Sequence, residues 1–241
     1  MPVLAVTGAK GGCGASLVAT NLALALTPYG ETLLVDMHVG DAGDDLLLDL
    51  LSERTWADLL PVASELTARH LELALQKHSS GLRFLAGPSK PPVTNPNVVA
   101  ELMIAVSSPF PWSVLDLPAR PPRDAEPLMI LADSILVVAT ADPPALRAAQ
   151  RLLEAMDPAV RARARLVLNQ FTRAHPAHPA SIAAGLQVSL LTALPTDPRA
   201  VGFHVNFGRP CVLDRHSVFG RRLAAAARSL AAGPRAGRVA A

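Results

Sequence analysis

Residues 3–16 read VLAVTGAKGGCGAS, an apolar run followed by a glycine-rich turn, and a helical run continues from there to residue 26. A strand, a glycine-rich turn and a helix N-terminus gather backbone N–H groups and the positive end of a helix dipole at one point. That arrangement suits a phosphate group. The stretch is therefore interpreted as a phosphate-binding loop.

The loop departs from the usual spacing G-x-x-x-x-G-K-[ST] at two places. Ala9 stands where the first glycine belongs, and Ala15 replaces the lysine that would reach the β and γ phosphates. The cradle is Gly11, Gly12, Cys13 and Gly14, followed by Ser16, whose hydroxyl stands where a Mg²⁺ ligand belongs. Loss of one charge-assisted hydrogen bond, worth roughly 1.5 to 3 kcal/mol, predicts nucleotide binding weakened about tenfold to a hundredfold.

Lys10 precedes the glycines and gives the variant pattern K-G-G-x-G-[K]-[ST]. This pattern resembles the ParA/MinD group of P-loop ATPases, in which a lysine at this position reaches the nucleotide of a partner subunit. The resemblance implies a sandwich homodimer that uses ATP or ADP with Mg²⁺. It also implies that Lys10 both contacts the nucleotide and acts in catalysis.

Strand-length apolar runs alternate with helix-period segments along the whole chain, which favours a mainly parallel sheet covered by helices on both faces. The expected fold is a three-layer αβα P-loop NTPase fold, formed by a single domain over residues 1–232 with a disordered tail at 233–241. Strands are expected at 3–7, 32–36, 82–86, 112–116, 134–140, 165–169 and 188–193. Helices are expected at 16–26, 55–60, 67–76, 97–107, 124–132, 143–156 and 217–231, with proline-rich connectors at 88–96, 118–127 and 173–179.

Two expected strands end in aspartate, Asp36 and Asp116, and ligands of open parallel sheets bind at the carboxyl ends of the strands. The resemblance implies that both carboxylates, with Ser16, lie on the Mg²⁺ side of the nucleotide, and that Asp36 also takes part in catalysis. His38 occupies the position of the aspartate that orients the attacking water in this group. The changes at Ala15 and His38 predict slow or absent ATP hydrolysis. An ATPase in which Lys10 and His38 act as substitutes is the alternative.

The ends of two later strands match the places where the family contacts the base. Asn169 is the expected adenine contact, and Pro195 and Asp197 belong to the segment LPTDP at 194–198. Turn chemistry explains Pro-Thr-Asp-Pro without a ligand. The amide of Asn169 could equally cap a strand end.

Further segments resemble the CpaE/TadZ proteins of tight-adherence (Flp-type) pilus systems. They are DMHVGDAGDDLLLD at 36–49, TWADLL at 55–60, HSSGLRFLAGP at 78–88, VLDLP at 114–118 and PPALRAAQRLL at 143–153. The resemblance implies a protein that places a pilus or secretion assembly, with that assembly's proteins as partners. A receiver-like domain usually precedes the ATPase in that branch, and here a separate partner is expected to supply its role.

Charge is divided unevenly, with 8 Lys and Arg against 16 Asp and Glu in residues 1–144, and 14 against 4 in residues 145–241. Such polarity could serve an anionic partner, or attraction between the two halves within the fold. The alternative function implied by the resemblance is a MinD/ParA-like septum-site or chromosome-positioning ATPase that binds membrane, or nucleoid DNA without sequence preference. The candidate arginines are Arg147, Arg151, Arg161, Arg163 and Arg165. Membrane association is expected to be weak or indirect, because the alanine-rich helix at 218–230 makes a poor lipid anchor. With two cysteines and no signal peptide, the expected location is cytoplasmic, at a pole or at the inner face of the membrane.

Overall fold

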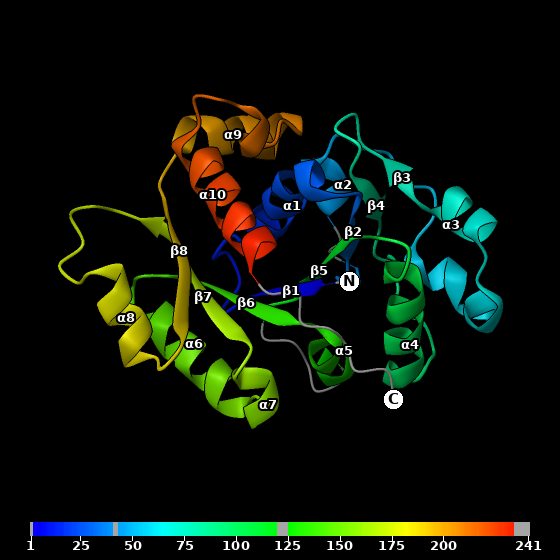
Figure 1. The fold of residues 1–241 in the computed structure, drawn as a ribbon, viewed down its shortest axis with the longest axis horizontal. Coiled ribbons are helices and arrows are strands. Elements are labelled where there is room, and N and C mark those ends of the chain that lie inside the picture. Colours follow the sequence, from blue (N-terminus) through cyan, green and yellow to red (C-terminus); the bar gives the residue numbers. More distant parts are fainter. Residues whose placement is uncertain (1, 41–42, 120–124, 234–241) are drawn as a thin grey trace.

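The computed structural model describes residues 2–40, 43–119 and 125–233, and its centre is one twisted sheet (Figure 1). The strand order is β3-β4-β2-β5-β1-β6-β7-β8. Every neighbouring pair is parallel except the short antiparallel pair of β3 and β4. The strands are β1 (Val3–Gly8), β2 (Thr32–Asp36), β3 (Gln76–Lys77), β4 (Arg83–Leu85), β5 (Trp112–Leu117), β6 (Ser134–Thr140), β7 (Ala164–Phe171) and β8 (Ser189–Pro195).

Helices cover both faces of the sheet, which confirms the three-layer α/β fold (Figure 1). The α-helices are α1 (Ala15–Leu26), α2 (Asp44–Leu47), α3 (Ala68–Ala74), α4 (Pro96–Ser107), α5 (Glu126–Leu131), α6 (Pro143–Ala155), α7 (Pro158–Arg161), α8 (Pro179–Gly185), α9 (Pro198–Phe207) and α10 (Val218–Ala232). Short 3₁₀ helices are η1 (Thr27–Tyr29), η2 (Trp56–Glu65) and η4 (Cys211–Leu213).

The sheet separates two hydrophobic cores. Alternate residues of β1 face opposite sides, as the pleat of a strand requires, so that Val3 and Ala5 join one core and Leu4 and Val6 the other. The first core packs under α4, α5, α6 and α8, and the second under α1 and α10. Burial on both faces explains why these strands read as unbroken apolar runs. Because β1, β2 and β5 run parallel, the loops that follow them lie at the same edge of the sheet.

All seven predicted strands are present, with ends shifted by at most two residues, and six of the seven predicted helices are present, but one was predicted wrongly and others were not predicted. The helix expected at 55–60 is the 3₁₀ helix η2, which runs to Glu65 and contains Pro61. Pro179, the last residue of the expected connector at 173–179, is instead the first residue of α8, and His178 is its N-cap. The helices α2, α7 and α9 and the strand β3 were not predicted. Residues 234–241 of the expected tail lie outside the described residues, as do residues 120–124 of the second connector.

The last helix, α10, is part of the second core. Its residues Phe219, Leu223, Ala226 and Ala227 are buried there. Its apolar side therefore packs on the sheet. None of the helices in the described ranges is long and apolar enough to cross a membrane.

Candidate nucleotide and metal site

The loop between β1 and α1 is shaped by two glycines with positive φ, Gly12 at 78° and Gly14 at 84°. Side chains with a Cβ atom rarely adopt this backbone conformation. A Cβ atom on Gly14 would also lie 2.4 Å from Nδ2 of Asn169. Around Gly11 and Gly12, in contrast, no described atom lies within 4 Å of where a Cβ would be, so this part of the loop faces open space.

Asn169 on β7 holds this loop in place. Its side chain is buried, and Nδ2 donates a hydrogen bond of 2.8 Å to the carbonyl oxygen of Cys13. Its Oδ1 accepts a bond of 2.9 Å from the backbone N–H of Gln170. The structure thus gives Asn169 a structural task that the sequence did not indicate. An adenine contact stays a prediction, which would depend on the second amide hydrogen.

The N-terminus of α1 carries no side-chain cap and no acidic residue in its first turn, within the part of the chain that the structure describes. Its first backbone N–H groups, which include those of Ala15 and Ser16, are therefore not used by a side chain. Together with the open face of the loop, these groups form a ready site for a phosphate. The methyl group of Ala15 adds no charge to it.

Asp36 and Asp116 lie side by side at the ends of β2 and β5, where they are register partners. Asp36 is buried, and both of its carboxylate oxygens accept hydrogen bonds. Its Oδ1 accepts a hydrogen bond of 2.9 Å from the backbone N–H of His38. Its Oδ2 accepts bonds of 3.0 and 3.2 Å from the backbone N–H groups of Gly43 and Asp44. Asp36 therefore also orders the loop that follows β2.

Asp116 is buried, and neither of its oxygens accepts a hydrogen bond of standard geometry from a described group. The pKa of this carboxyl is raised to about 7, mainly by burial and also by Asp36, against the lowering effects of His38 and the nearby Ser16 hydroxyl. An unpaired buried carboxyl is costly to maintain. A cation at this place would remove that cost.

Asp44, on α2, completes the buried acidic group, and the sequence analysis missed it. Burial raises its pKa well above the usual range, and the nearby Asp116 and Asp36 raise it further. Its Oδ2 also accepts no bond from a described group. The acidic run DAGDD at 41–45 was the available signal, but nothing in it distinguished the buried Asp44 from its half-buried neighbour Asp45.

His38 contacts both strand-end carboxylates. Its Nδ1 lies 2.8 Å from Oδ1 of Asp36 and 3.4 Å from Oδ2 of Asp116, and the side chain is 22% exposed. A Cβ atom on Gly87 would come within 2.1 Å of the carbonyl oxygen of His38, so the backbone here depends on a glycine. The structure thus brings Ser16, Asp36, His38 and Asp116 together, as predicted.

Lys10 points to a neighbouring acidic residue that the sequence analysis did not single out. Its Nζ lies 3.5 Å from Oδ1 of Asp142, with side-chain exposures of 35% and 42%. Asp142 is the N-cap of α6, and it is bonded to the hydroxyl of Thr140 and to the backbone N–H of Ala145. Hydrogen bonding to Thr140 is the main cause of its lowered pKa, to which Lys10 also contributes. Lys10 and Asp142 share a cavity of about 530 Å³ with Gly12.

Asp197 joins two helices. Its Oδ1 accepts a bond of 3.3 Å from Ala200 and caps α9, while its Oδ2 accepts bonds from the Ser217 hydroxyl at 2.7 Å and the Phe219 N–H at 3.3 Å. Partial burial works to raise its pKa, but the hydrogen bonds prevail and the pKa is lowered. Asp197 thus has a structural role as the N-cap of α9, which needs no ligand. A base contact by Pro195 or Asp197 stays a prediction.

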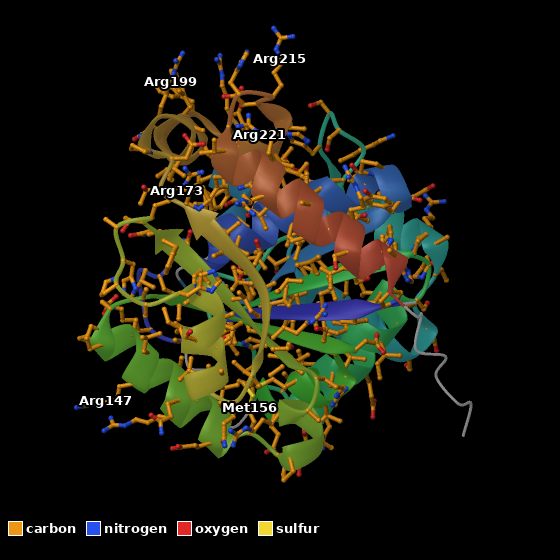
Figure 2. All side chains as sticks on the ribbon, turned by 60° about the vertical axis from the view of Figure 1, so that its left-hand side comes forward. Arg147, Met156, Arg173, Arg199, Arg215 and Arg221 are labelled. Carbon is orange, nitrogen blue, oxygen red and sulfur yellow. The ribbon has the colours of Figure 1, made fainter. Side chains whose placement is uncertain are left out.

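One candidate arginine for DNA binding, Arg163, is bonded within the fold. The guanidinium of Arg163 donates to the backbone carbonyls of Ala159 at 3.2 Å, of Ile130 at 3.1 Å, and of Ala132. It is therefore part of the fold. Figure 2 shows Arg147 at one end of the molecule and Arg199 and Arg215 at the other. The basic second half of the chain thus spreads its charge over the surface.

A family model and a curated relative agree on the family. The model described as cellulose biosynthesis protein BcsQ matches residues 1–179. The septum site-determining protein MinD of Helicobacter pylori is 29% identical over 158 residues, which cover 64% of this chain and 59% of that protein. The match thus spans less than two thirds of that relative's length.

Solved structures agree on the fold. A ParA family ATPase from Chlorobium tepidum TLS superposes with a TM-score of 0.83 at 22% identity, covering 94% of this chain and 98% of that one. The MinD protein of Pyrococcus horikoshii OT3, solved in complex with Mg-ADP, gives 0.79 at 20% identity, with 95% of each chain covered. At these identities the likeness shows the three-layer fold alone.

Proposed function

Because this chain belongs to the BcsQ family of ParA/MinD-type P-loop ATPases, we propose that it is a positioning protein that binds ATP with Mg²⁺ and pairs with a second copy of itself. One observation carries the proposal most directly. The uncapped N-terminus of α1 and the unpaired carboxylate of Asp116 lie at the same edge of the sheet. The first suits an anion and the second a cation, which is the combination that a Mg²⁺-nucleotide presents.

Each part of the nucleotide has residues suited to it. The phosphates would lie against the backbone of Gly11 to Gly14 and the first N–H groups of α1, at Ala15 and Ser16. Mg²⁺ would be held by the Ser16 hydroxyl with Asp36 and Asp116, and it would neutralise charge between phosphate oxygens. Orphaned buried oxygens on Asp116 fit such an ion. The Mg-ADP bound to the P. horikoshii MinD supports this proposal.

Hydrolysis is proposed to be slow or absent. Ala15 places no ammonium group near the β and γ phosphates, and electrostatic stabilisation of this kind is usually the largest catalytic term. His38 replaces a fixed negative charge with an imidazole that is already in contact with Asp36 and Asp116. Such a chain would act through binding and release of the nucleotide more than through turnover. The alternative is an active ATPase in which Lys10 and His38 substitute for the lysine absent at Ala15 and the aspartate absent at position 38.

Pairing of two copies is proposed to depend on Lys10. Its side chain is one-third exposed and held only by the 3.5 Å pair with Asp142, which is itself well exposed. An exposed ion pair contributes little, of order 0 to 1 kcal/mol, so Lys10 can leave it at small cost. It could then reach a phosphate bound by the partner copy.

The positioning role follows the septum-site proteins among the relatives, and the family name points to cellulose biosynthesis as the process served. A pilus or secretion assembly of the CpaE/TadZ type is the second candidate partner, favoured only by the sequence segments described above. Binding to nucleoid DNA has weaker support, because Arg163, one of the five candidate arginines, is bonded to backbone carbonyls of the fold. A cytoplasmic location with weak or indirect membrane association completes the proposal.

Calorimetric titration of ATP and ADP, with and without Mg²⁺, tests nucleotide binding. We expect micromolar affinity for ATP that improves with Mg²⁺. Ser16→Ala should lose the Mg²⁺ effect while keeping Mg²⁺-free binding, since only the hydroxyl is removed. Ser181→Ala, on the exposed side of α8, is the matched control. No heat of binding at millimolar ATP would contradict the proposal.

A further inference from the structure

The loop after β2 and the end of β5 bring one imidazole and two carboxylates to a single point. One ligand atom from each of Asp36, His38 and Asp116 lies within 4.8 Å of the other two. From Nδ1 of His38 the separations are 2.8 Å to Asp36 and 3.4 Å to Asp116. A tetrahedral ion with bonds of about 2.0 to 2.2 Å holds its ligand atoms roughly 3.3 to 3.6 Å apart. Small side-chain rotations would therefore produce the required geometry.

The point also lacks positive charge. Asp36, Asp44 and Asp116 are each at most 1% exposed, and His38 is the one basic side chain in the cluster that gathers at Asp36 and Asp116 among the described residues. Both oxygens of Asp116 and one of Asp44 accept no hydrogen bond from any described group. Burial of unpaired carboxyl oxygens is unfavourable unless a proton or a metal compensates for it.

Two of the three ligand groups, Asp36 and His38, are also held in place before any ion arrives. The backbone N–H of His38 donates to Asp36, which fixes the histidine next to the carboxylate. Gly87 packs against the carbonyl oxygen of His38 and limits how far the loop can move. The side chain of His38 is 22% exposed, and this exposed part leaves an ion a path from solvent to the imidazole. Preformed ligands and an entry path are what a metal site requires.

We propose that Asp36, His38 and Asp116 form a binding site for a divalent transition-metal ion, such as Zn²⁺ or Co²⁺, that fills in the absence of nucleotide. The imidazole decides the class of ion. Mg²⁺ prefers oxygen ligands in octahedral geometry, whereas Zn²⁺ and Co²⁺ bind imidazole nitrogen well. All three ligands come from one chain, so the site needs no second copy, and it shares Asp36 and Asp116 with the proposed Mg²⁺-nucleotide site.

Titration of Co²⁺ alone into the full-length protein, purified without a histidine tag and treated with chelator, tests the proposal. We expect the intense visible absorption of a four-coordinate Co²⁺ site, which saturates at one equivalent and shows no thiolate charge-transfer band. One equivalent of Zn²⁺ should abolish the absorption, and millimolar Mg²⁺ should leave it in place. No nucleotide is present in this titration, so a failure to bind Co²⁺ would not count against the proposed ATP binding. A failure to bind ATP would likewise not count against the metal site.

Variants at histidines identify the ligand. His38→Asn should weaken Co²⁺ binding by more than about tenfold, since even the loss of a group that only supports a ligand costs 10- to 100-fold. His38→Asp should keep binding but give the weak absorption of an oxygen-only site. His216→Asn changes an exposed histidine far from the cluster along the chain and should match the unmodified protein. Circular dichroism of each variant checks that it is folded.

Four results would overturn the proposal. They are no visible absorption with the unmodified protein, a thiolate band that places the ion on a cysteine, full displacement by Mg²⁺ at equal concentration, and unchanged affinity in folded His38→Asn.

Discussion

Gly14 decides the shape of the loop through contacts with one side chain. It needs both a left-handed backbone, at φ 84°, and the absence of a Cβ atom next to Nδ2 of Asn169. Sequence alone indicated the glycine-rich loop but not the residue that packs on it, because β7 is more than 150 residues away along the chain. In the same way Asp44 could not be recognised, since its burial depends on how the loop after Asp36 folds back.

We predict that Gly14→Ala disrupts the loop and Gly11→Ala does not. The first substitution strains the backbone by about 1 to 2 kcal/mol and displaces the amide of Asn169. The second places a methyl group in a position with no described atom within 4 Å. Thermal unfolding should show a lower midpoint for Gly14→Ala alone. Equal loss in both variants would show that the contact with Asn169 is unimportant.

His204 on α9 makes stability depend on pH. Its ring is fully buried, with Nδ1 2.9 Å from Nδ2 of Asn21, and burial lowers its pKa to about 4, which the backbone of Leu47 opposes only in part. The unfolded chain takes up a proton below pH 6.5, while the folded protein resists protonation until about pH 4. The contribution of His204 is therefore complete above pH 6.5 and is lost as the pH falls, by about 3 kcal/mol at most.

Chemical denaturation between pH 4 and 7 measures this effect. The free energy of unfolding should rise with pH in the unmodified protein, and His204→Gln should flatten that rise. His216→Gln, at an exposed histidine, is the control. An unchanged slope in folded His204→Gln would assign the pH dependence to other groups.

Strands and helices differ in how well the sequence indicated them, for a physical reason. The seven predicted strands are continuous apolar runs because both faces of the sheet are buried. The missed helices α8 and α9 begin at a capping residue followed by proline, His178-Pro179 and Asp197-Pro198. Proline is favoured at the first helical position, but both dipeptides also suit turns, and the turn interpretation was chosen.

Asp197 should matter for stability more than an ordinary cap does. It accepts bonds from α9 and from the start of α10, so Asp197→Ala leaves donors of both helices without a partner. We expect a loss of about 1 to 3 kcal/mol in denaturant unfolding. Asp157→Ala, which caps only the short α7, should cost about 1 kcal/mol or less. Equal effects would argue against the joint role of Asp197.

The whole molecule has the fold of an ATPase family. Ala15 and His38 stand where a lysine and an aspartate are expected to promote hydrolysis in that family. Its phosphate loop, strand-end carboxylates and helix layers were all predictable, because they rest on local patterns and on a parallel sheet that brings strand ends together. The ion pair of Lys10 with Asp142 and the contacts of His38 were not, since they depend on how separate loops meet. The proposed function at this scale depends on whether ATP binds and on what its binding does to pairing.

Restoring the two missing groups should restore turnover. In Ala15→Lys combined with His38→Asp, phosphate release at saturating ATP should rise by about a hundredfold or more over the unmodified protein, since each added group acts on the transition state. Ala15→Lys alone should tighten ATP binding and raise phosphate release by less than the double variant does. A double variant that binds ATP but releases phosphate no faster would show that other features limit hydrolysis.

The central claim is that ATP drives two copies to pair without being hydrolysed at a significant rate. The most direct test measures the mass by light scattering with ATP or ADP, together with phosphate release from the same samples. We predict that ATP with Mg²⁺ shifts the mass from 25.2 kDa toward twice that value with negligible turnover, and that ADP does not. Lys10→Ala should stay at the mass of one chain, while Lys90→Ala, at an exposed lysine, should pair normally. A mass that stays at 25.2 kDa under saturating ATP, or a Lys10→Ala variant that pairs like the unmodified protein, would contradict the account.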